Sequence, residues 1–93
     1  MQKTVHKYPL ELCDSQLIMM PVGAKILDIQ EQGGVACIWA LVNPEADIIG
    51  RTFETFGTGQ PIITEEGENK RYIGTYLKYS IATELHVFEL VGA

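Results

Sequence analysis

The sequence contains very little cysteine, which limits the chemistry it can support. Cys13 and Cys37 are the only two, and their spacing gives neither a disulfide framework nor a Cys-x-x-Cys metal or redox pair. Cys37 lies in an apolar, strand-like run, where a buried and unreactive thiol is the usual outcome. We therefore expect no disulfide-stabilised fold and no cysteine-based centre.

Long hydrophobic runs are also missing. The longest apolar stretch covers residues 35–42, well short of the roughly 20 residues needed to span a bilayer. The first nine residues, MQKTVHKYP, contain no apolar segment of the kind found in a signal peptide. These features predict a cytoplasmic protein without a membrane partner.

Basic residues are scarce as well. The sequence has seven lysines and arginines and twelve acidic residues, which gives a net charge of −5. Among the basic residues, only Lys70 and Arg71 are adjacent in the sequence. Binding to a nucleic-acid backbone requires a basic face, so we do not expect it here. An acidic protein of this kind can instead attract a partner with a basic surface.

Strand-like patterns fill most of the 93 residues, and turn signals recur about every eight to twelve residues. Pro9 lacks a backbone N–H, which predicts an edge position or a bulge for the first strand. We predict one domain over residues 1–93. Its fold class is all-β and mainly antiparallel, as a small sandwich or partly closed barrel of about six to seven short strands. At most a short helical turn is expected, at residues 43–47. The expected strands are residues 3–12, 16–20, 25–31, 35–43, 49–56, 71–79 and 84–91.

The clearest local signal is the glycine pair Gly33-Gly34 between two apolar runs. Such a pair supplies the positive φ angles of a two-residue hairpin, so residues 25–31 and 35–43 should be antiparallel neighbours. Residues 35–42 are apolar on both faces, which predicts a central strand covered on both sides by the fold or by a partner chain. Together with the edge strand around Pro9, this predicts a homodimer or higher oligomer.

Catalytic and metal-binding constellations are not apparent. His6 and His86 lie on the first and last expected strands and could be neighbours in a closed sheet, but two histidines make a poor metal site. Neither cysteine occupies an exposed, electropositive position suited to a nucleophile. The acidic cluster at residues 65–68 lies on a polar, glycine-broken loop that would not hold catalytic geometry. We expect a non-enzymatic protein with no catalytic residues, no metal and no cofactor.

One motif, Gly57-Thr58-Gly59, allows a ligand-binding interpretation. Successive backbone N–H groups of a Gly-x-Gly turn can form an anion-binding nest. No helix is expected after it, since residues 61–63 read as extended, and the two glycines could simply let the chain leave a strand. If the motif binds phosphate, Arg51, Lys70 and Arg71 could neutralise the charge and Trp39, Tyr72 or Tyr76 could stack on a base. The candidate ligand-binding residues are Gly57, Thr58, Gly59, Arg51, Arg71 and Tyr72.

Several short strings are distributed along the chain: KYPL (7–10), MPVGAKIL (20–27), WALV (39–42), RTF (51–53), GTGQPI (57–62), YIGT (72–75) and HVFE (86–89). With these strings the sequence resembles a family of small, uncharacterised proteins encoded by bacteriophages and prophages. The resemblance covers nearly the whole chain and implies a single domain, but it implies no activity or residue role.

The resemblance implies a setting in which small proteins without enzyme signatures often occupy a host factor. The first hypothesis is therefore a phage-type inhibitor that binds a host protein, such as a defence component, in the bacterial cytoplasm. The second is an oligomer that binds and sequesters a nucleotide-like small molecule near residues 57–59. The third is an accessory or structural virion protein.

Overall fold

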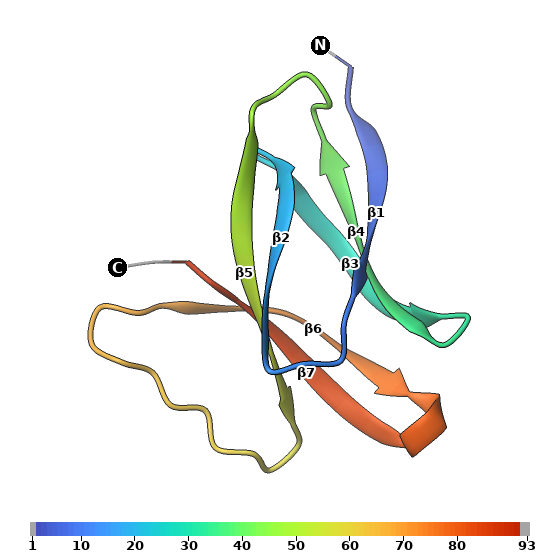
Figure 1. The fold of residues 1–93 in the computed structure, drawn as a ribbon, viewed down its shortest axis with the longest axis vertical. Coiled ribbons are helices and arrows are strands. Elements are labelled where there is room, and N and C mark those ends of the chain that lie inside the picture. The colour runs from blue at the N-terminus through green and yellow to red at the C-terminus, as the bar shows by residue number, and fades with distance from the viewer. Residues whose placement is uncertain (1, 92–93) are drawn as a thin grey trace.

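The computed structural model describes residues 2–91, and within them the chain forms seven strands and one short helix (Figure 1). No helix in this part of the chain is long and apolar enough to cross a membrane. The elements are β1 (Thr4–Leu10), β2 (Ser15–Pro21), β3 (Lys25–Gln32), β4 (Val35–Val42), β5 (Ile48–Gly57), β6 (Lys70–Lys78), the 3₁₀ helix η1 (Tyr79–Ile81) and β7 (Thr83–Leu90).

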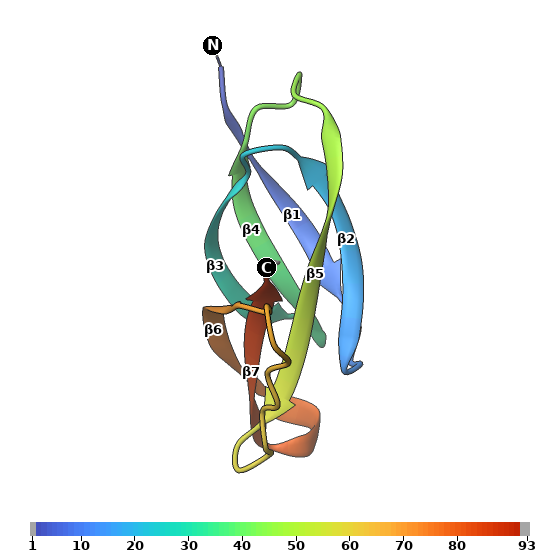
Figure 2. The ribbon, with the colours of Figure 1, turned by 90° about the vertical axis from the view of Figure 1, so that its left-hand side faces the viewer.

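The strands form two antiparallel sheets that pack face to face. One has the order β1-β4-β3 and the other β2-β5-β7-β6. Figure 2 shows the two layers edge-on, with β1, β3 and β4 on one side and β2 and β5 on the other. The predicted all-β, antiparallel fold is confirmed, and the architecture is a sandwich and not a closed barrel.

The predicted hairpin is confirmed. Gly33 and Gly34 both have positive φ, at 60° and 86°, and they join β3 to β4. Such angles favour glycine because a Cβ atom would clash with the backbone. β4 is central in its sheet and β1 lies at the edge, as Pro9 indicated.

One face of β4 forms the middle of the core. Its side chains alternate small and large, which leaves room for Phe53 and Met20 of the facing sheet, both fully buried. The inward residues of β4 are Ala36, Ile38, Ala40 and Val42, all at most 4% exposed.

No sheet formed by residues 2–91 lies over the second apolar face of β4, and neighbouring side chains reduce its exposure. Cys37 is buried, as expected, and Trp39 is half-buried. Lys7 of β1 donates to Gln32 Oε1 of β3 at 3.0 Å, so this hydrogen bond spans the strand that carries Cys37. Neighbouring side chains of the same sheet therefore cover Cys37, whereas Val35 on this face stays 45% exposed.

Two sequence expectations were wrong. The helical turn lies at residues 79–81, while residues 43–47 form a non-helical turn in which Asn43 Oδ1 accepts the Glu45 N–H. Asparagine competes with helix formation in this way because its side chain bonds the local backbone. His6 and His86 are not neighbours, since β1 and β7 belong to different sheets.

The two sheets approach most closely where β3 meets β6. Gly74 allows this contact, because a Cβ atom there would lie only 2.5 Å from Ile29 Cγ2. The β6–β7 register also shifts between Tyr72 and Gly74, so a bulge accompanies the close approach. Side chains, not a backbone ladder, therefore close this side of the sandwich.

Candidate functional site

The sequence-predicted ligand residues do not form one site. Arg51, Arg71 and Tyr72 line a single cavity of about 210 Å³ between the beginnings of β3 and β6. Gly57 lines a different hollow of about 140 Å³, beside Cys13. The structure thus brings the two arginines and Tyr72 together and leaves the glycine motif outside their cavity.

Arg51 is engaged by the protein itself. Its Nε and Nη2 donate to the two carboxylate oxygens of Glu89 at 2.6 and 2.8 Å, and its Nη1 donates to the Ala24 carbonyl at 2.6 Å. The hydrogen bond to Glu89 is the main reason the pKa of Arg51 is raised above its ordinary value. Because Glu89 is 4% exposed and neutralises this guanidinium, the main role of Arg51 is to stabilise the fold.

The Gly57-Thr58-Gly59 segment forms a closed turn. The Gln60 N–H donates to the Gly57 carbonyl at 3.1 Å, and Gly59 has the positive φ of 86° that such a turn requires. The Gly57 N–H, which a nest would aim at an anion, donates instead to Gln60 Oε1 at 2.9 Å. This geometry matches the simpler interpretation, in which the glycines let the chain leave β5.

Thr58 instead takes part in a polar chain on the outer face of the second sheet. Its Oγ1 lies 2.7 Å from His86 Nε2, and Thr75 Oγ1 lies 2.8 Å from His86 Nδ1. The Tyr72 hydroxyl is 2.6 Å from Thr75 Oγ1. Thr58 and Tyr72 are therefore linked by this polar chain. They do not line the same cavity, because Tyr72 lines the Arg51 cavity and Thr58 does not.

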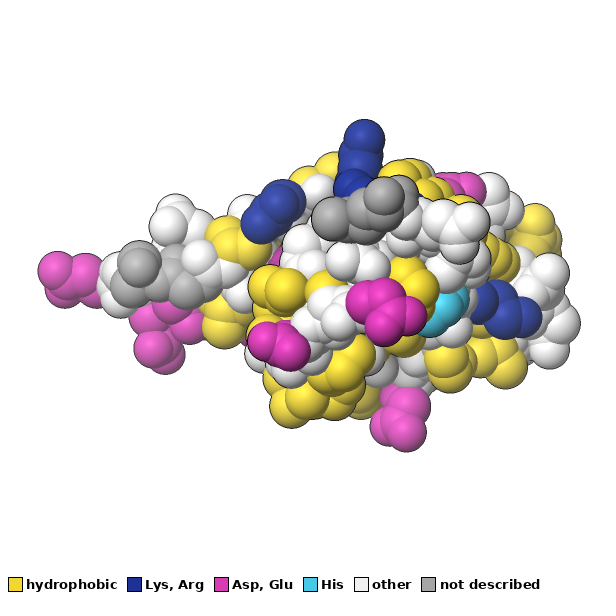
Figure 3. Space-filling model, turned by 90° about the horizontal axis from the view of Figure 1, so that it is seen from above, with side chains coloured by type: hydrophobic (Ala, Val, Ile, Leu, Met, Phe, Trp, Pro, Cys, Tyr) yellow, Lys and Arg dark blue, Asp and Glu magenta, His cyan; other side chains and the backbone are white. Residues whose placement is uncertain are grey.

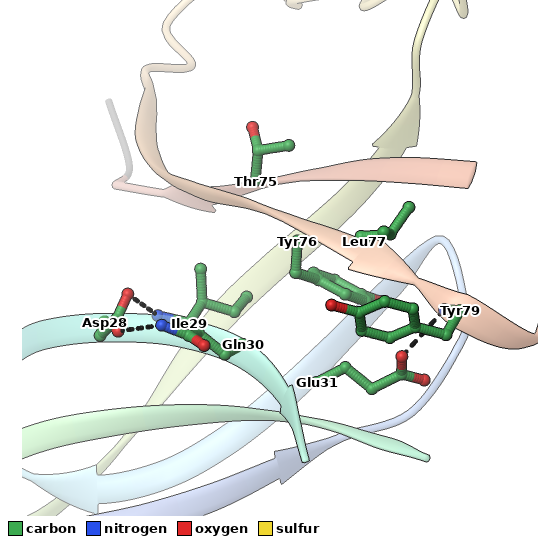
Figure 4. Close-up of a pocket in the computed structure, with 8 residues that line it drawn as sticks. All are labelled: Asp28, Ile29, Gln30, Glu31, Thr75, Tyr76, Leu77 and Tyr79. Atoms are coloured by element: carbon green, nitrogen blue, oxygen red, sulfur yellow. Dashed lines mark hydrogen bonds between the residues drawn. The ribbon is translucent and has the colours of Figure 1, made fainter. Parts of the chain in front are cut away.

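The most developed candidate site is a groove that follows β3. Two hollows, of about 240 and 320 Å³, meet at Asp28, Gln30 and Glu31. Figure 4 shows the first of them between β3 and β6, with Thr75 pointing to the opposite side of β6 from Tyr76. The remaining residues that line this groove are Ile29, Thr75, Tyr76, Leu77 and Tyr79 in the first hollow, and Gln32 and Trp39 in the second.

Three aromatic residues of the groove carry polar atoms with no hydrogen-bond partner within residues 2–91. They are Trp39 at its indole N–H and Tyr76 and Tyr79 at their hydroxyls. Tyr79 is 74% exposed, whereas Tyr76 is only 5% exposed. Burial is the main reason the pKa of Tyr76 is raised, with the charge of Glu31 next, so its phenol stays protonated at neutral pH. Tyrosine and tryptophan with apolar bodies and free polar tips are typical of protein interfaces.

The two carboxylates of the groove differ in role. Glu31 accepts the Tyr79 N–H at 2.9 Å and pairs with Lys78 at 3.0 Å, and these contacts hold its pKa below the ordinary value. Asp28 forms no ion pair among the described residues and accepts only the Ile29 N–H at 2.8 Å and the Gln30 amide at 2.9 Å. Glu31 thus fastens the sheets, and Asp28 supplies the negative charge open to a ligand.

The sequence predicts only part of this groove. It indicates Trp39 and Tyr76 as candidate stacking residues, but it does not indicate Asp28, Glu31 or Tyr79. A register shift in β3 between Ile26 and Asp28 places Asp28 opposite Trp39, and a strand pattern alone gives no signal for such a bulge. Tyr79 depends on η1, which the sequence did not predict.

Within the part of the chain that the structure describes, no group of three or more metal-ligating side chains gathers. Comparison with curated proteins and with solved structures gave no match. The model of a family described as "Domain of unknown function (DUF7352)" matches residues 1–93. The chain therefore belongs to this DUF7352 family, an uncharacterised one.

Proposed function

We propose that this chain is a non-enzymatic domain that binds a protein partner through the groove along β3. The observation that carries the proposal is the set of three aromatic residues with unused polar atoms that line the two hollows: Trp39 opposite Asp28 in one, and Tyr76 and Tyr79 in the other. Interface hot spots are enriched in such aromatics because they bury a large apolar area and also form hydrogen bonds.

The charge of the groove indicates the chemistry of the partner segment. A lysine or arginine side chain could pair with Asp28 while its charge lies over the face of Trp39, which is opposite Asp28 in the sheet, a contact worth about 0.5–2 kcal/mol. The overall charge of −5 would speed the approach of such a basic surface. The resemblance to phage and prophage proteins extends the proposal: the partner is a host factor, such as a defence component, which the chain inhibits by occupying it in the bacterial cytoplasm.

The proposal is tested by comparing baits in affinity capture from bacterial lysate. The groove bait carries Asp28→Asn and Tyr79→Ser, and the control bait carries Asp47→Asn and Ile63→Ser. Both pairs remove one carboxylate and one highly exposed apolar side chain, with Tyr79 at 74% and Ile63 at 78% exposure. The Tyr79 N–H bond to Glu31 is retained in the groove bait because it belongs to the backbone.

We expect a stoichiometric partner on the wild-type and control baits, with affinity for the groove bait at least about tenfold weaker. Equal capture by both variant baits would overturn the assignment to the groove. Capture of no stoichiometric partner by the wild-type protein would count against protein binding altogether.

A small anionic or nucleotide-like ligand is the second candidate, and one observation favours it. Lys25 and Arg71 both line the Arg51 cavity and form no ion pair among the described residues. The cavity's 210 Å³ is below the roughly 300 Å³ at which ligand sites usually begin, which fits a phosphate better than a whole nucleotide. Thermal-shift measurements with cyclic and linear nucleotides and inorganic phosphate test this candidate, since any ligand above its Kd must raise stability. No shift at millimolar concentrations would eliminate it.

A further inference from the structure

Within residues 2–91 the sandwich has four edge strands, and three of them are protected against pairing with another strand. β3 and β6 approach one another, and Lys78 ties them by bonds to Glu31 and to the Gly34 carbonyl at 2.7 Å. β1 carries Lys7 and Pro9, and Pro9 offers no N–H to a new neighbour. Charged residues, proline, bulges and covering elements are the usual means of preventing edge-to-edge association.

β2 has none of these protections along its length. Its sequence, SQLIMMP, contains no charged residue and no glycine, and its only proline, Pro21, is the last residue. The register with β5 runs from Ser15 opposite Glu54 to Pro21 opposite Ile48 without a shift. An uncharged, regular edge of this length is a template for another strand.

The free backbone groups of β2 can be located from the bonds at its two ends. Thr55 N–H donates to the Asp14 carbonyl at 3.0 Å, and Val22 N–H donates to the Asp47 carbonyl at 2.7 Å. Antiparallel hydrogen-bonded pairs occur at every second residue, so the even-numbered residues of β2 bond to β5. The N–H and C=O groups of Leu17 and Met19 therefore point to the open edge.

The same two residues expose their side chains. Leu17 is 64% exposed and Met19 is 53% exposed on the outer face of the sheet, and Ile48 on neighbouring β5 is 56% exposed. Seen from above, hydrophobic side chains gather along the lower margin of the molecule, on the side where β2 and β5 lie (Figure 3). Hydrogen-bonding groups and apolar side chains thus meet at one edge.

We propose that β2 pairs antiparallel with β2 of a second copy, which joins the two four-stranded sheets into one sheet of eight strands across a two-fold axis. Placing Leu17 of each copy opposite the other, with Ser15 opposite Met19, uses the outward-pointing groups and leaves Pro21 outside the ladder. A second copy is a suitable partner although both chains are anionic, because β2 itself carries no charge. Pairing β2 with β2 therefore places no like charges opposite one another in the new ladder.

The pairing leaves the groove free. β2 and β6 lie at opposite edges of the second sheet, so the groove between β3 and β6 faces away from the two-fold axis. The dimer would therefore present two grooves, and a bivalent partner would bind it more tightly than it binds one chain. This inference does not depend on the proposed function of the groove.

The test is the solution mass of the wild-type protein and of edge variants, measured by light scattering at tens of micromolar. Leu17→Lys and Met19→Lys place a charge on the β2 edge, and Val5→Lys is the matched control on the β1 edge, where Val5 is 50% exposed. We expect twice the chain mass for the wild type and for Val5→Lys, and the single chain mass for both β2 variants with unchanged circular dichroism.

Hydrogen exchange of the wild-type protein gives a second readout that needs no variant. The amides of Leu17 and Met19 should exchange slowly at high protein concentration and quickly on dilution, while the Ile18 amide, bonded to β5, stays protected at both. A monomeric wild type, a dimer that both β2 variants leave intact, or concentration-independent exchange at Leu17 and Met19 would each overturn the proposal.

Discussion

At the residue scale, Arg51 shows how one side chain can serve stability where a ligand role was expected. Its guanidinium reaches Glu89 on β7 and the Ala24 carbonyl ahead of β3, so it connects both sheets. The side chains of Arg51 and Glu89 are 13% and 5% exposed. Removal of one partner leaves the other as an uncompensated buried charge. This lowers the free energy of unfolding by more than the intact pair contributes to it.

We predict that Arg51→Met destabilises the protein by roughly 3 kcal/mol because it strands the Glu89 carboxylate. The double variant Arg51→Met/Glu89→Met should recover much of that loss. Arg71→Met is the matched control, since Arg71 lines the same cavity without an ion pair, and its effect should stay within about 0.5 kcal/mol. Urea unfolding of the four proteins measures these differences. A double variant no more stable than Arg51→Met would contradict this account.

The ion pair of Arg51 with Glu89 could not be predicted from the sequence, although the face on which Arg51 lies could. Strand alternation places Arg51 on the same face of β5 as Phe53 and Thr55, and that face is the interior. The partner that decides its role, Glu89, lies 38 residues away in the sequence. Strand periodicity specifies which face a residue occupies, but it carries no information on the strand that will lie opposite.

At the element scale, features set by local chain geometry were predictable and those set by distant contacts were not. The Gly33-Gly34 hairpin follows from backbone sterics, so β3 and β4 paired as expected. The edge position of β1 follows from the missing backbone N–H of Pro9. In contrast, the bulge in β3 and the open edge at β2 depend on pairings between distant segments. The groove was therefore only partly foreseen.

Gly74 and Gly50 make a matched test of the contact between β3 and β6. A Cβ at Gly74 meets Cγ2 of the buried, β-branched Ile29 at 2.5 Å, which cannot move aside easily. A Cβ at Gly50 meets Cδ1 of the exposed Leu17 at 2.8 Å, and that side chain can rotate away. We predict that Gly74→Ala destabilises the protein by about 1–3 kcal/mol, as overpacking does, and that Gly50→Ala is nearly neutral.

Thermal unfolding of both alanine variants checks the prediction, with circular dichroism to confirm that the strands are retained. Equal losses of melting temperature at the two positions would mean that replacing a strand glycine lowers stability whatever atoms the new Cβ meets. A neutral Gly74→Ala would mean that the sheets can separate at this seam without cost.

At the scale of the whole molecule, an apolar core, the bonds of Arg51 and a polar seam between β3 and β6 hold the two sheets together. The core is thin, because β4 contributes alanines at two of its four inward positions. The seam consists of Glu31, Lys78 and the Tyr79 N–H, which connect β3 to the end of β6. On the far side, β1 and β2 leave the sandwich open, and this asymmetry gives the molecule one closed side with a groove and one open edge.

The seam makes stability depend on pH in a defined direction. The Tyr79 N–H and then Lys78 stabilise the ionised form of Glu31, so its pKa in the folded protein lies below the ordinary value of about 4.3. A depressed pKa contributes stability that is fully present above the unfolded-state value and is lost as the pH falls through the folded-state value. We therefore predict that wild type exceeds Glu31→Gln in melting temperature at pH 6 and that the gap closes as the pH falls below about 4.

The control is Glu45→Gln, because Glu45 is exposed and forms no ion pair within residues 2–91. Its melting temperature should follow that of the wild type across the same pH range. A pH-independent gap for Glu31→Gln would mean that the side chain acts through its shape and hydrogen bonding, not through its charge. A gap that widens on acidification would contradict the ionised Glu31 altogether, because the neutral carboxyl would then be the form that joins the two sheets.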